Sequence, residues 1–306
     1  MKKSILFFVI TLFLFSSCAP QKKFLTTDTR LPVNDTYKKT RKEKEETHLL
    51  GICNRAGLQA EPFNKWFDKN YQKYEPNPAV IAKGKSKIKG VEVLAFFGTW
   101  CGDSKRNIPR FYKVMDEMGF DEKNLKLVSL SNVKGAYKQS PSKEEKGLNI
   151  HRVPTFIFYK NGKEIGRIVE DPMTSLEVDI AQIVNGLAPT PKYATQALIH
   201  KNIQELGVKS IEKKLENYGK YVARHTKNSS ELNGYGYMLL NTKKMEEAIL
   251  VFKINTLAYP KDPNVFDSLG EAYLAAGNKK LAIENYKKVL ELNPDHKNAK
   301  EVLEKI

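Results

Sequence analysis

Cys101 is the residue in this sequence that is best placed to do chemistry. It follows residues 91–97, an apolar run of strand length, and the residues after it are spaced as in an amphipathic helix. A thiolate at a helix N-terminus is stabilised by unpaired backbone N–H groups and by the helix dipole. Lys105 and Arg106 add positive potential one turn further on, whereas Asp103 opposes it. The pattern predicts a nucleophilic sulfur that attacks disulfides and forms mixed disulfides.

The elements that must position Cys101 are indicated by the hydrophobic pattern of the chain. Their order is strand, helix, strand, crossover, hairpin and helix, which predicts an α/β layer fold with mixed strand pairing. An Asn-Gly pair marks the hairpin turn. The elements are strands at residues 91–97, 125–130, 154–159 and 163–169, a helix after Cys101, a hairpin turn at Asn161-Gly162 and a helix at residues 176–184.

The motifs around Cys101 resemble those of the thioredoxin family. They are Trp100-Cys101-Gly102-Asp103-Ser104 at a helix start, Pro109 within that helix, and Val153-Pro154-Thr155 before the hairpin. The resemblance covers residues 85–188 and implies a thioredoxin-like fold with a mixed sheet and flanking helices. It also implies that Pro154 is a cis-proline whose loop, including Val153, faces the sulfur, and that Trp100 and Gly102 belong to the thiol site. The full set of motifs is similar to a group of bacterial thioredoxin-family lipoproteins.

Two residues depart from the family pattern. Thioredoxin-type reduction uses a second cysteine three positions after the first, and Ser104 occupies that position here. Ala95 stands where the family buries an aspartate. The Ser104 hydroxyl can donate to the thiolate but cannot displace a bound partner. The predicted site is therefore monothiol, and release of a mixed disulfide needs a second thiol from the substrate, from a small molecule or from elsewhere in the chain.

Cys53 and His151 are weaker candidates. Cys53 is either the resolving partner of Cys101 or a semi-buried free cysteine, because no motif surrounds it. His151 could approach Cys101 as a base, although a histidine in such a place is more often a surface loop residue. We find no metal-ligand spacing among the histidines and cysteines, and no phosphate-binding or Ser/His/Asp signature, so we predict no metal and no cofactor.

The N-terminus has the pattern of a secretory signal. Lys2 and Lys3 precede an apolar run at residues 5–15, which is too short to span a bilayer. Phe15-Ser16-Ser17-Cys18 resembles the lipoprotein cleavage site, after which Cys18 carries the lipid; the alternative is an ordinary signal peptide. We expect a signal peptide at residues 1–17, a flexible tether at 18–47 and a lipid-anchored protein in the bacterial cell envelope, facing the periplasm or exterior.

The C-terminal third repeats itself. Residues that recur 34 positions later match the tetratricopeptide pattern, as Gly236 and Phe252 match Gly270 and Tyr286. A Gly- and Pro-containing linker at 186–191 precedes two amphipathic helices predicted at 192–207 and 208–225. The expected domains are a thioredoxin-like domain with an N-terminal extension at 48–188, a linker with a helical pair at 189–228, and tetratricopeptide repeats with a capping helix at 229–306.

The distribution of charge along the chain narrows the classes of molecule that could be its partner. The net charge of +16 is spread over the chain rather than gathered into a stripe, which argues against nucleic acid. We therefore expect thiol–disulfide exchange through Cys101 on envelope proteins or peptides that bear thiols or disulfides, with the repeat groove recruiting a protein partner and the lipid anchor binding the membrane. The alternative, from a different class, is a non-catalytic adaptor that uses both folds as binding surfaces.

Overall fold

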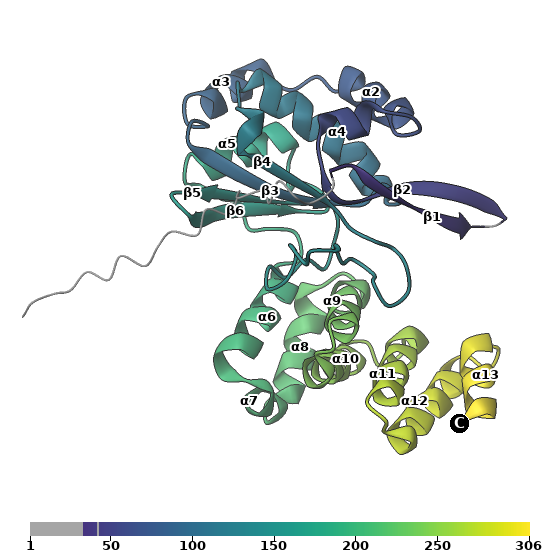
Figure 1. The fold of residues 1–306 in the computed structure, drawn as a ribbon. Coiled ribbons are helices and arrows are strands. Elements are labelled where there is room, and N and C mark those ends of the chain that lie inside the picture. Colours follow the sequence, from purple (N-terminus) through teal and green to yellow (C-terminus); the bar gives the residue numbers. More distant parts are fainter. Residues whose placement is uncertain (1–32, 42) are drawn as a thin grey trace, which may run out of the picture.

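The computed structural model describes residues 33–41 and 43–306. These residues form an α/β domain followed by an α-helical domain, and the helical domain lies on the side of the sheet opposite the helices of the α/β domain (Figure 1). The predicted fold class, an α/β domain with a mixed sheet followed by a helical region, is confirmed. The predicted signal peptide and Cys18 lie outside the described residues.

The sheet contains six strands within the described residues, in the order β1-β2-β4-β3-β5-β6. β3 lies inside the sheet and pairs in parallel with β4 and antiparallel with β5. The predicted Asn161-Gly162 turn joins β5 to β6, with both residues at positive φ. The strands are β1 Asp35–Arg41, β2 Lys44–Cys53, β3 Val91–Phe97, β4 Leu125–Ser129, β5 Thr155–Lys160 and β6 Lys163–Val169.

The two faces of β3 are covered by different kinds of structure. Val93 and Phe97 pack into a core formed with the helices of the α/β domain, whereas Phe96 packs on the opposite face with apolar residues of the segment 130–153. Burial on both faces explains why β3 is a continuous apolar run rather than an alternating one. The helices of this domain are α1 Arg55–Gln59, α2 Asn64–Lys73, α3 Pro78–Lys85, α4 Gly102–Glu117 and α5 Leu176–Val184, with a short 3₁₀ turn, η1, at Glu122–Asn124.

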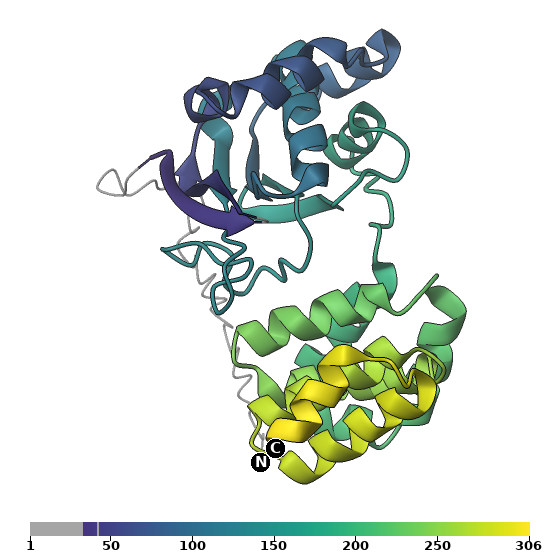
Figure 2. The same cartoon turned by 90° about the vertical axis from the view of Figure 1, so that its right-hand side faces the viewer.

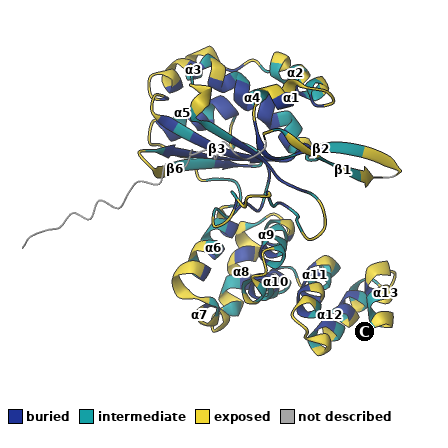
Figure 3. Ribbon diagram, in the orientation of Figure 1, coloured by how far each residue is buried: buried dark blue, intermediate teal, exposed yellow. Residues whose placement is uncertain are grey.

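The tether predicted for residues 18–47 is wrong at its described end. β1 pairs with β2 as an antiparallel hairpin that extends from the sheet, and most of its outer part is exposed (Figure 3). The hairpin forms without an apolar period because backbone pairing and side-chain contacts hold it. Lys38 forms an ion pair with Glu45 at 2.8 Å, and the Tyr37 hydroxyl donates to Asn132 at 2.9 Å.

The helical domain follows the predicted repeat pattern. The predicted helix over 192–207 is observed as α6, whereas the single helix predicted over 208–225 is divided into α7 and α8. None of the helices in the described ranges has both the length and the apolar character needed to cross a membrane. The helices are α6 Ala194–Leu206, α7 Val208–Glu212, α8 Leu215–His225, α9 Ser230–Asn241, α10 Met245–Ala258, α11 Pro263–Ala275, α12 Lys279–Leu292 and α13 Lys297–Lys305.

The repeated glycines permit close packing between paired helices. A Cβ atom at Gly236 in α9 would lie 2.5 Å from the Phe252 ring of α10, and one at Gly270 in α11 would lie 3.1 Å from the Tyr286 ring of α12. The first contact excludes a side chain at Gly236 unless the ring shifts, and the second leaves a Cβ at Gly270 only a tight fit against its ring. This contact is the physical basis of the sequence repeat.

The segment 130–153 belongs to the α/β domain, lies between the two domains and forms hydrogen bonds with the helical domain (Figure 2). The Arg152 guanidinium donates to the Ser230 carbonyl at 2.7 Å, and the Gln139 amide donates to the Asn241 carbonyl at 3.0 Å. The buried His151 ring meets Tyr193 and Tyr235 edge-on, at centroid distances of 5.5 and 6.4 Å. His151 is therefore a residue of the domain junction, and the expectation of a surface loop histidine is wrong.

Burial lowers the pKa of His151 to about 3. A histidine in an unfolded chain titrates near pH 6.5. Between about pH 3 and 6.5, His151 therefore binds a proton in the unfolded chain but not in the folded one. The contribution of the neutral, buried His151 to the free energy of unfolding is therefore fully present above pH 6.5 and is lost as the pH falls towards 3. We predict that wild-type protein loses about 2 kcal/mol more than His151→Asn on acidification from pH 7.5 to 5.0, measured by urea unfolding. His225→Asn, at an exposed position, is the control; equal losses in wild type and His151→Asn would contradict the prediction.

Candidate functional site

Cys101 lies at the start of α4, in a turn that backbone hydrogen bonds close. Cys101 has extended backbone angles and is the N-cap of the helix, and its carbonyl accepts from the Lys105 N–H at 3.0 Å. Its own N–H donates to the Gly98 carbonyl at 2.9 Å. The sulfur is thus carried to a helix N-terminus directly after β3, where the helix dipole favours a thiolate.

The Cys101 sulfur faces the loop before β5. Its Sγ donates to the Val153 carbonyl at 3.3 Å, and the peptide bond between Val153 and Pro154 is cis. The predicted approach of Cys101 to this loop is confirmed, and so is the cis-proline. The catalytic roles assigned to these residues stay predictions, which the function proposed below takes up.

Trp100 covers one side of the turn. Its indole N–H donates to the Leu130 carbonyl at 2.7 Å, and its ring lies 5.7 Å from that of Tyr137. Gly98 permits this position, because a Cβ atom there would lie 2.5 Å from the indole. Gly102 is exposed, with open space where a Cβ would stand. Trp100 therefore forms an aromatic wall beside the sulfur, and Gly102 leaves the start of α4 open to solvent.

Ser104 supports the turn from inside. Its side chain is fully buried, and its hydroxyl accepts from the Gly98 N–H at 3.2 Å. The sequence suggested that this hydroxyl could donate to the Cys101 sulfur; the hydrogen bond observed for it is the one from Gly98. Ser104 thus stabilises the geometry that presents Cys101.

Cys53 does not occupy a resolving position in this structure. It lies in the core between sheet and helices, where its thiol donates to the Gly51 carbonyl at 3.3 Å and both cysteines are free. Cys53 pairs with Leu127 of β4, and Leu127 pairs with Ala95 of β3. Two strand spacings of about 4.8 Å therefore separate Cys53 from β3, more than the roughly 7 Å between Cα atoms that a disulfide spans. Burial raises the pKa of the Cys53 thiol to about 12.

The charges beside Cys101 form a network with the β6–α5 loop. Arg106 pairs with Asp103 at 2.8 Å and also with Asp171, so the Asp103 carboxylate that should oppose a thiolate is partly neutralised. Burial alone would raise the pKa of Asp171, but hydrogen bonds from Asn107, Lys192 and Arg106 outweigh it and hold that pKa below its usual range. These ion pairs hold the Arg106 guanidinium between Asp103 of α4 and Asp171 of the β6–α5 loop. Lys105 stays half-buried, with its carbonyl accepting from the Asn70 amide at 3.1 Å.

Lys138 is a residue of the site that the sequence reasoning missed. It is 8% exposed, its ammonium donates to the His151 carbonyl, and its Nζ lies 5.0 Å above the Tyr137 ring. Burial lowers its pKa to about 8, while interaction with Cys101 opposes the shift. The Lys138 ammonium and the Cys101 thiol thus donate to carbonyls two residues apart in one loop, those of His151 and Val153. No sequence signal marks it, because it belongs to a polar segment without periodicity.

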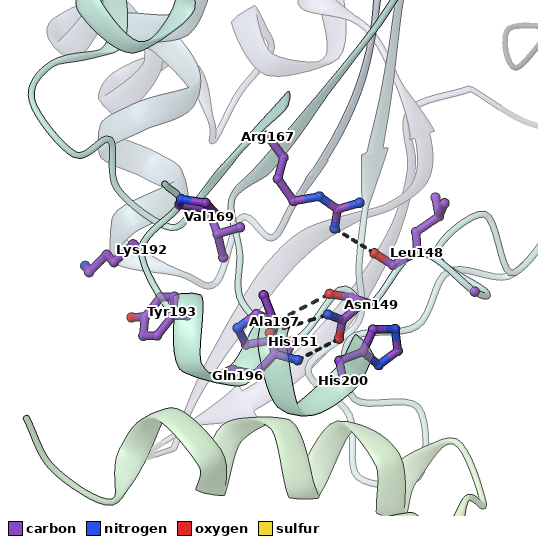
Figure 4. Close-up of a pocket in the computed structure, with 12 residues that line it drawn as sticks. Leu148, Asn149, His151, Arg167, Val169, Lys192, Tyr193, Gln196, Ala197 and His200 are labelled. Carbon is purple, nitrogen blue, oxygen red and sulfur yellow. Dashed lines mark hydrogen bonds between the residues drawn. The ribbon is translucent and has the colours of Figure 1, made fainter. Parts of the chain in front are cut away.

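A separate cavity of about 230 Å³ lies at the domain junction (Figure 4). Asn149 and Gln196 point toward one another across it, and the Gln196 amide donates to Asn149 at 3.0 Å. The Cys101 side chain is not part of its lining. No group of histidine, cysteine or carboxylate side chains in the described ranges could hold a metal ion.

Comparison with known proteins agrees with this geometry. A family model described as "Thioredoxin" matches residues 80–182, and one described as "Tetratricopeptide repeat" matches residues 268–296. The chain is 34% identical over 92 residues to a thioredoxin of Malassezia sympodialis, a match that covers 30% of this chain and 80% of that protein. The chain belongs to the thioredoxin family.

Two further relatives match parts of the chain. A thioredoxin-like protein of Acanthamoeba polyphaga mimivirus is 32% identical over 97 residues, which are 31% of this chain and 63% of the viral protein. Superkiller protein 3 of Schizosaccharomyces pombe is 26% identical over 141 residues, which are 45% of this chain and 10% of that protein. The thioredoxin matches support thiol redox chemistry in general, and the repeat match supports interaction with proteins.

The two thiols should differ sharply in reactivity. In folded protein carrying Cys18→Ser, we predict that iodoacetamide modifies Cys101 and spares Cys53, because a buried thiol with a pKa of about 12 has little thiolate at pH 8. Peptide mass spectrometry of the alkylated protein checks this, and unfolding in urea before alkylation is the control that should expose both thiols. Modification of Cys53 at a comparable rate in the folded protein would contradict the prediction.

Proposed function

We propose that this protein performs thiol–disulfide exchange on other proteins through Cys101 alone. The observation that carries the proposal is the position of the sulfur: it lies at a helix N-terminus, faces the carbonyl of Val153 beside a cis-proline, and has no second thiol near it among the described residues. Membership of the thioredoxin family supports the chemistry.

The exchange begins when the Cys101 thiol loses its proton to solvent and attacks one sulfur of a substrate disulfide. The Cys101–substrate bond forms as the substrate S–S bond breaks, and the second substrate sulfur leaves as a thiolate that takes up a proton. Two routes complete the cycle. A different thiolate of the substrate can displace Cys101, which rearranges the substrate disulfides without net oxidation. Two external thiols can instead reduce the substrate and become a disulfide themselves.

Ser104 decides how long the mixed disulfide lasts. A resolving cysteine would attack it intramolecularly at an effective concentration of roughly 1 mM or more, and a hydroxyl does not replace it. The buried, hydrogen-bonded Ser104 and the distant Cys53 both favour slow release. This behaviour suits disulfide rearrangement, in which the substrate supplies the resolving thiol, more than rapid reduction.

Long-lived mixed disulfides are the test of the proposal. After a challenge with glutathione disulfide, wild-type protein should carry a Cys101–glutathione adduct that is absent from Cys101→Ala. With free thiol at about 10 µM, its release should be roughly 100-fold slower than in Ser104→Cys, given an effective concentration near 1 mM in that variant. Intact-protein mass spectrometry over time measures both.

Cys53→Ala is the matched control, and its adduct should decay at the wild-type rate because Cys53 lies out of reach. Absence of a Cys101 adduct would instead support a second function, a redox-silent adaptor. That alternative is favoured by the loss of the second cysteine and by the use of Ser104 as a buried support for the turn.

We also propose that the protein is lipid-anchored through Cys18 in the bacterial cell envelope, facing the periplasm or exterior. The support is the sequence alone: a basic start, a short apolar run and Ser-Ser-Cys at the expected cleavage site. The anchor would bring the thiol site to envelope proteins that carry disulfides, and the repeats would recruit a partner there.

Cys18→Ala should abolish lipidation. Expressed in a bacterium, wild-type protein should incorporate radiolabelled palmitate and partition into detergent, whereas the variant should remain unlabelled and either uncleaved or soluble. Cys53→Ala is the matched control and should keep the label. Equal labelling and equal processing of wild type and Cys18→Ala would reject the anchor.

A further inference from the structure

A cleft leads from the thiol site to the helical repeats. One cavity of about 330 Å³ includes Trp100 in its lining, and a second of about 530 Å³ reaches α9 and α11. Lys39, Asn132 and Tyr137 line both, so the two cavities adjoin one another, and we call the pair the interdomain cleft. The segment 130–153, which lies between the two domains (Figure 2), contributes Asn132, Lys134, Tyr137, Lys138 and Arg152 to the lining of the second cavity.

The cleft begins at Trp100, in the turn that carries Cys101. Trp100 at its near end is the neighbour of Cys101 in the chain. Tyr137 and Lys138 line it as well. The Tyr137 ring lies 5.7 Å from that of Trp100, and Lys138 donates to the His151 carbonyl, two residues before the Val153 carbonyl that accepts from the Cys101 thiol. A segment of chain lying in the cleft would thus pass the sulfur at one end and the repeats at the other.

The lining of the cleft is basic. Cationic side chains outnumber carboxylates, with only Glu46 and Glu271 on the acidic side. The Glu271 carboxylate accepts a hydrogen bond from the Tyr237 hydroxyl at 2.9 Å. Lys39, Lys138 and Arg152 donate to backbone carbonyls, which do not cancel their charge. Arg152 also lies 3.7 Å from Glu170. The net positive charge of the lining still favours an acidic ligand. The cations are Lys39, Arg41, Lys134, Lys138 and Arg152.

The lining of the cleft is also rich in polar side chains, some of them buried. Within the described residues, Asn233 Oδ1 and Arg152 Nε are buried without a hydrogen-bond partner, one an acceptor on the repeats and the other a donor on the thioredoxin domain. Asn132 and Asn264 line opposite walls, and amides both donate and accept as a peptide backbone requires.

We propose that the interdomain cleft binds an extended acidic segment of a substrate protein and thereby brings a cysteine of that segment to Cys101. This proposal rests on the exchange activity proposed above and names its substrate class. An extended peptide fits the observations because it supplies carboxylates for the cations and backbone N–H and C=O groups for the amide side chains that line the cleft. Both domains contribute to one site, so the repeats select the substrate of the thiol.

The test is equilibrium binding of two short fluorescein-labelled peptides to the full chain carrying Cys18→Ser and Cys101→Ser, so that no covalent bond forms. One peptide is rich in Asp and Glu and has Ser in place of its cysteine; the matched peptide has Lys at each acidic position. Fluorescence anisotropy should show binding of the acidic peptide alone, weakening as salt is raised. Equal affinity for both peptides would overturn the proposal.

Charge variants on each wall locate the site. Lys134→Glu on the thioredoxin side and Asn264→Glu on the repeat side are both at exposed positions in the cleft. Each should weaken acidic-peptide binding about five- to ten-fold. Lys163→Glu and Lys280→Glu, at exposed positions outside the cleft, are the matched controls and should stay within about two-fold of the parent protein. An effect of only one cleft variant would reject a site shared by both domains.

The binding test separates this proposal from the exchange activity, because it uses protein without the reactive sulfur. Peptide binding with the expected variant pattern, in a protein whose Cys101 forms no adduct, would support the cleft and reject the exchange. A Cys101 that forms adducts, in a protein that binds both peptides equally, would support the exchange and reject the cleft. A single-stranded oligonucleotide that binds as tightly, with the same dependence on Lys134 and Asn264, would overturn the assignment to an acidic peptide.

Discussion

The pairing of β3 with strands of opposite direction on its two sides is the constraint on which the site depends. Because β4 runs parallel to β3 and β5 antiparallel, the end of β3, the end of β4 and the start of β5 meet at one edge of the sheet. The turn that carries Cys101 leaves from the first, and the cis-Pro154 loop enters the last. Their contact is a consequence of strand direction, and the hydrogen bond from Gly98 to Ser104 then holds the sulfur in place.

The same edge explains how the two domains are joined. The segment 130–153 starts and ends there, and its apolar residues cover the face of the sheet that the helices leave open. Its polar residues are left facing the repeats, where Arg152 and Gln139 bond to the helical domain. One segment therefore completes the core, attaches the repeats and lines the interdomain cleft with Lys138. The α/β domain and the helical domain therefore share this segment, because its residues pack on the sheet of one and form hydrogen bonds with the other.

The monothiol character of the site has a structural counterpart. Ser104 sits where a second sulfur would be expected, yet its hydroxyl has a definite role under the turn. Cys53 is held in the core by burial and by strand register, which keep it from Cys101. In the exchange proposed above, Cys101 would depend on thiols brought by the substrate or by small molecules, so substrate recruitment would be part of the chemistry. The basic cleft between the Trp100 turn and the repeats fits that proposal.

The sequence by itself determined those features that depend on local periodicity. β3, β6 and α5 begin and end where the apolar pattern predicts, and the repeat pairs that glycine makes with an aromatic ring are visible as a spacing. The outer hairpin, the burial of Cys53 and the place of Lys138 were decided only by the tertiary structure. Each depends on partners far along the chain: β1 and β2 join the sheet through β4, and Lys138 becomes a neighbour of Cys101 only when the segment 130–153 folds over the sheet. Periodicity reports which face of an element is buried, whereas contacts between distant segments follow from how those faces are packed.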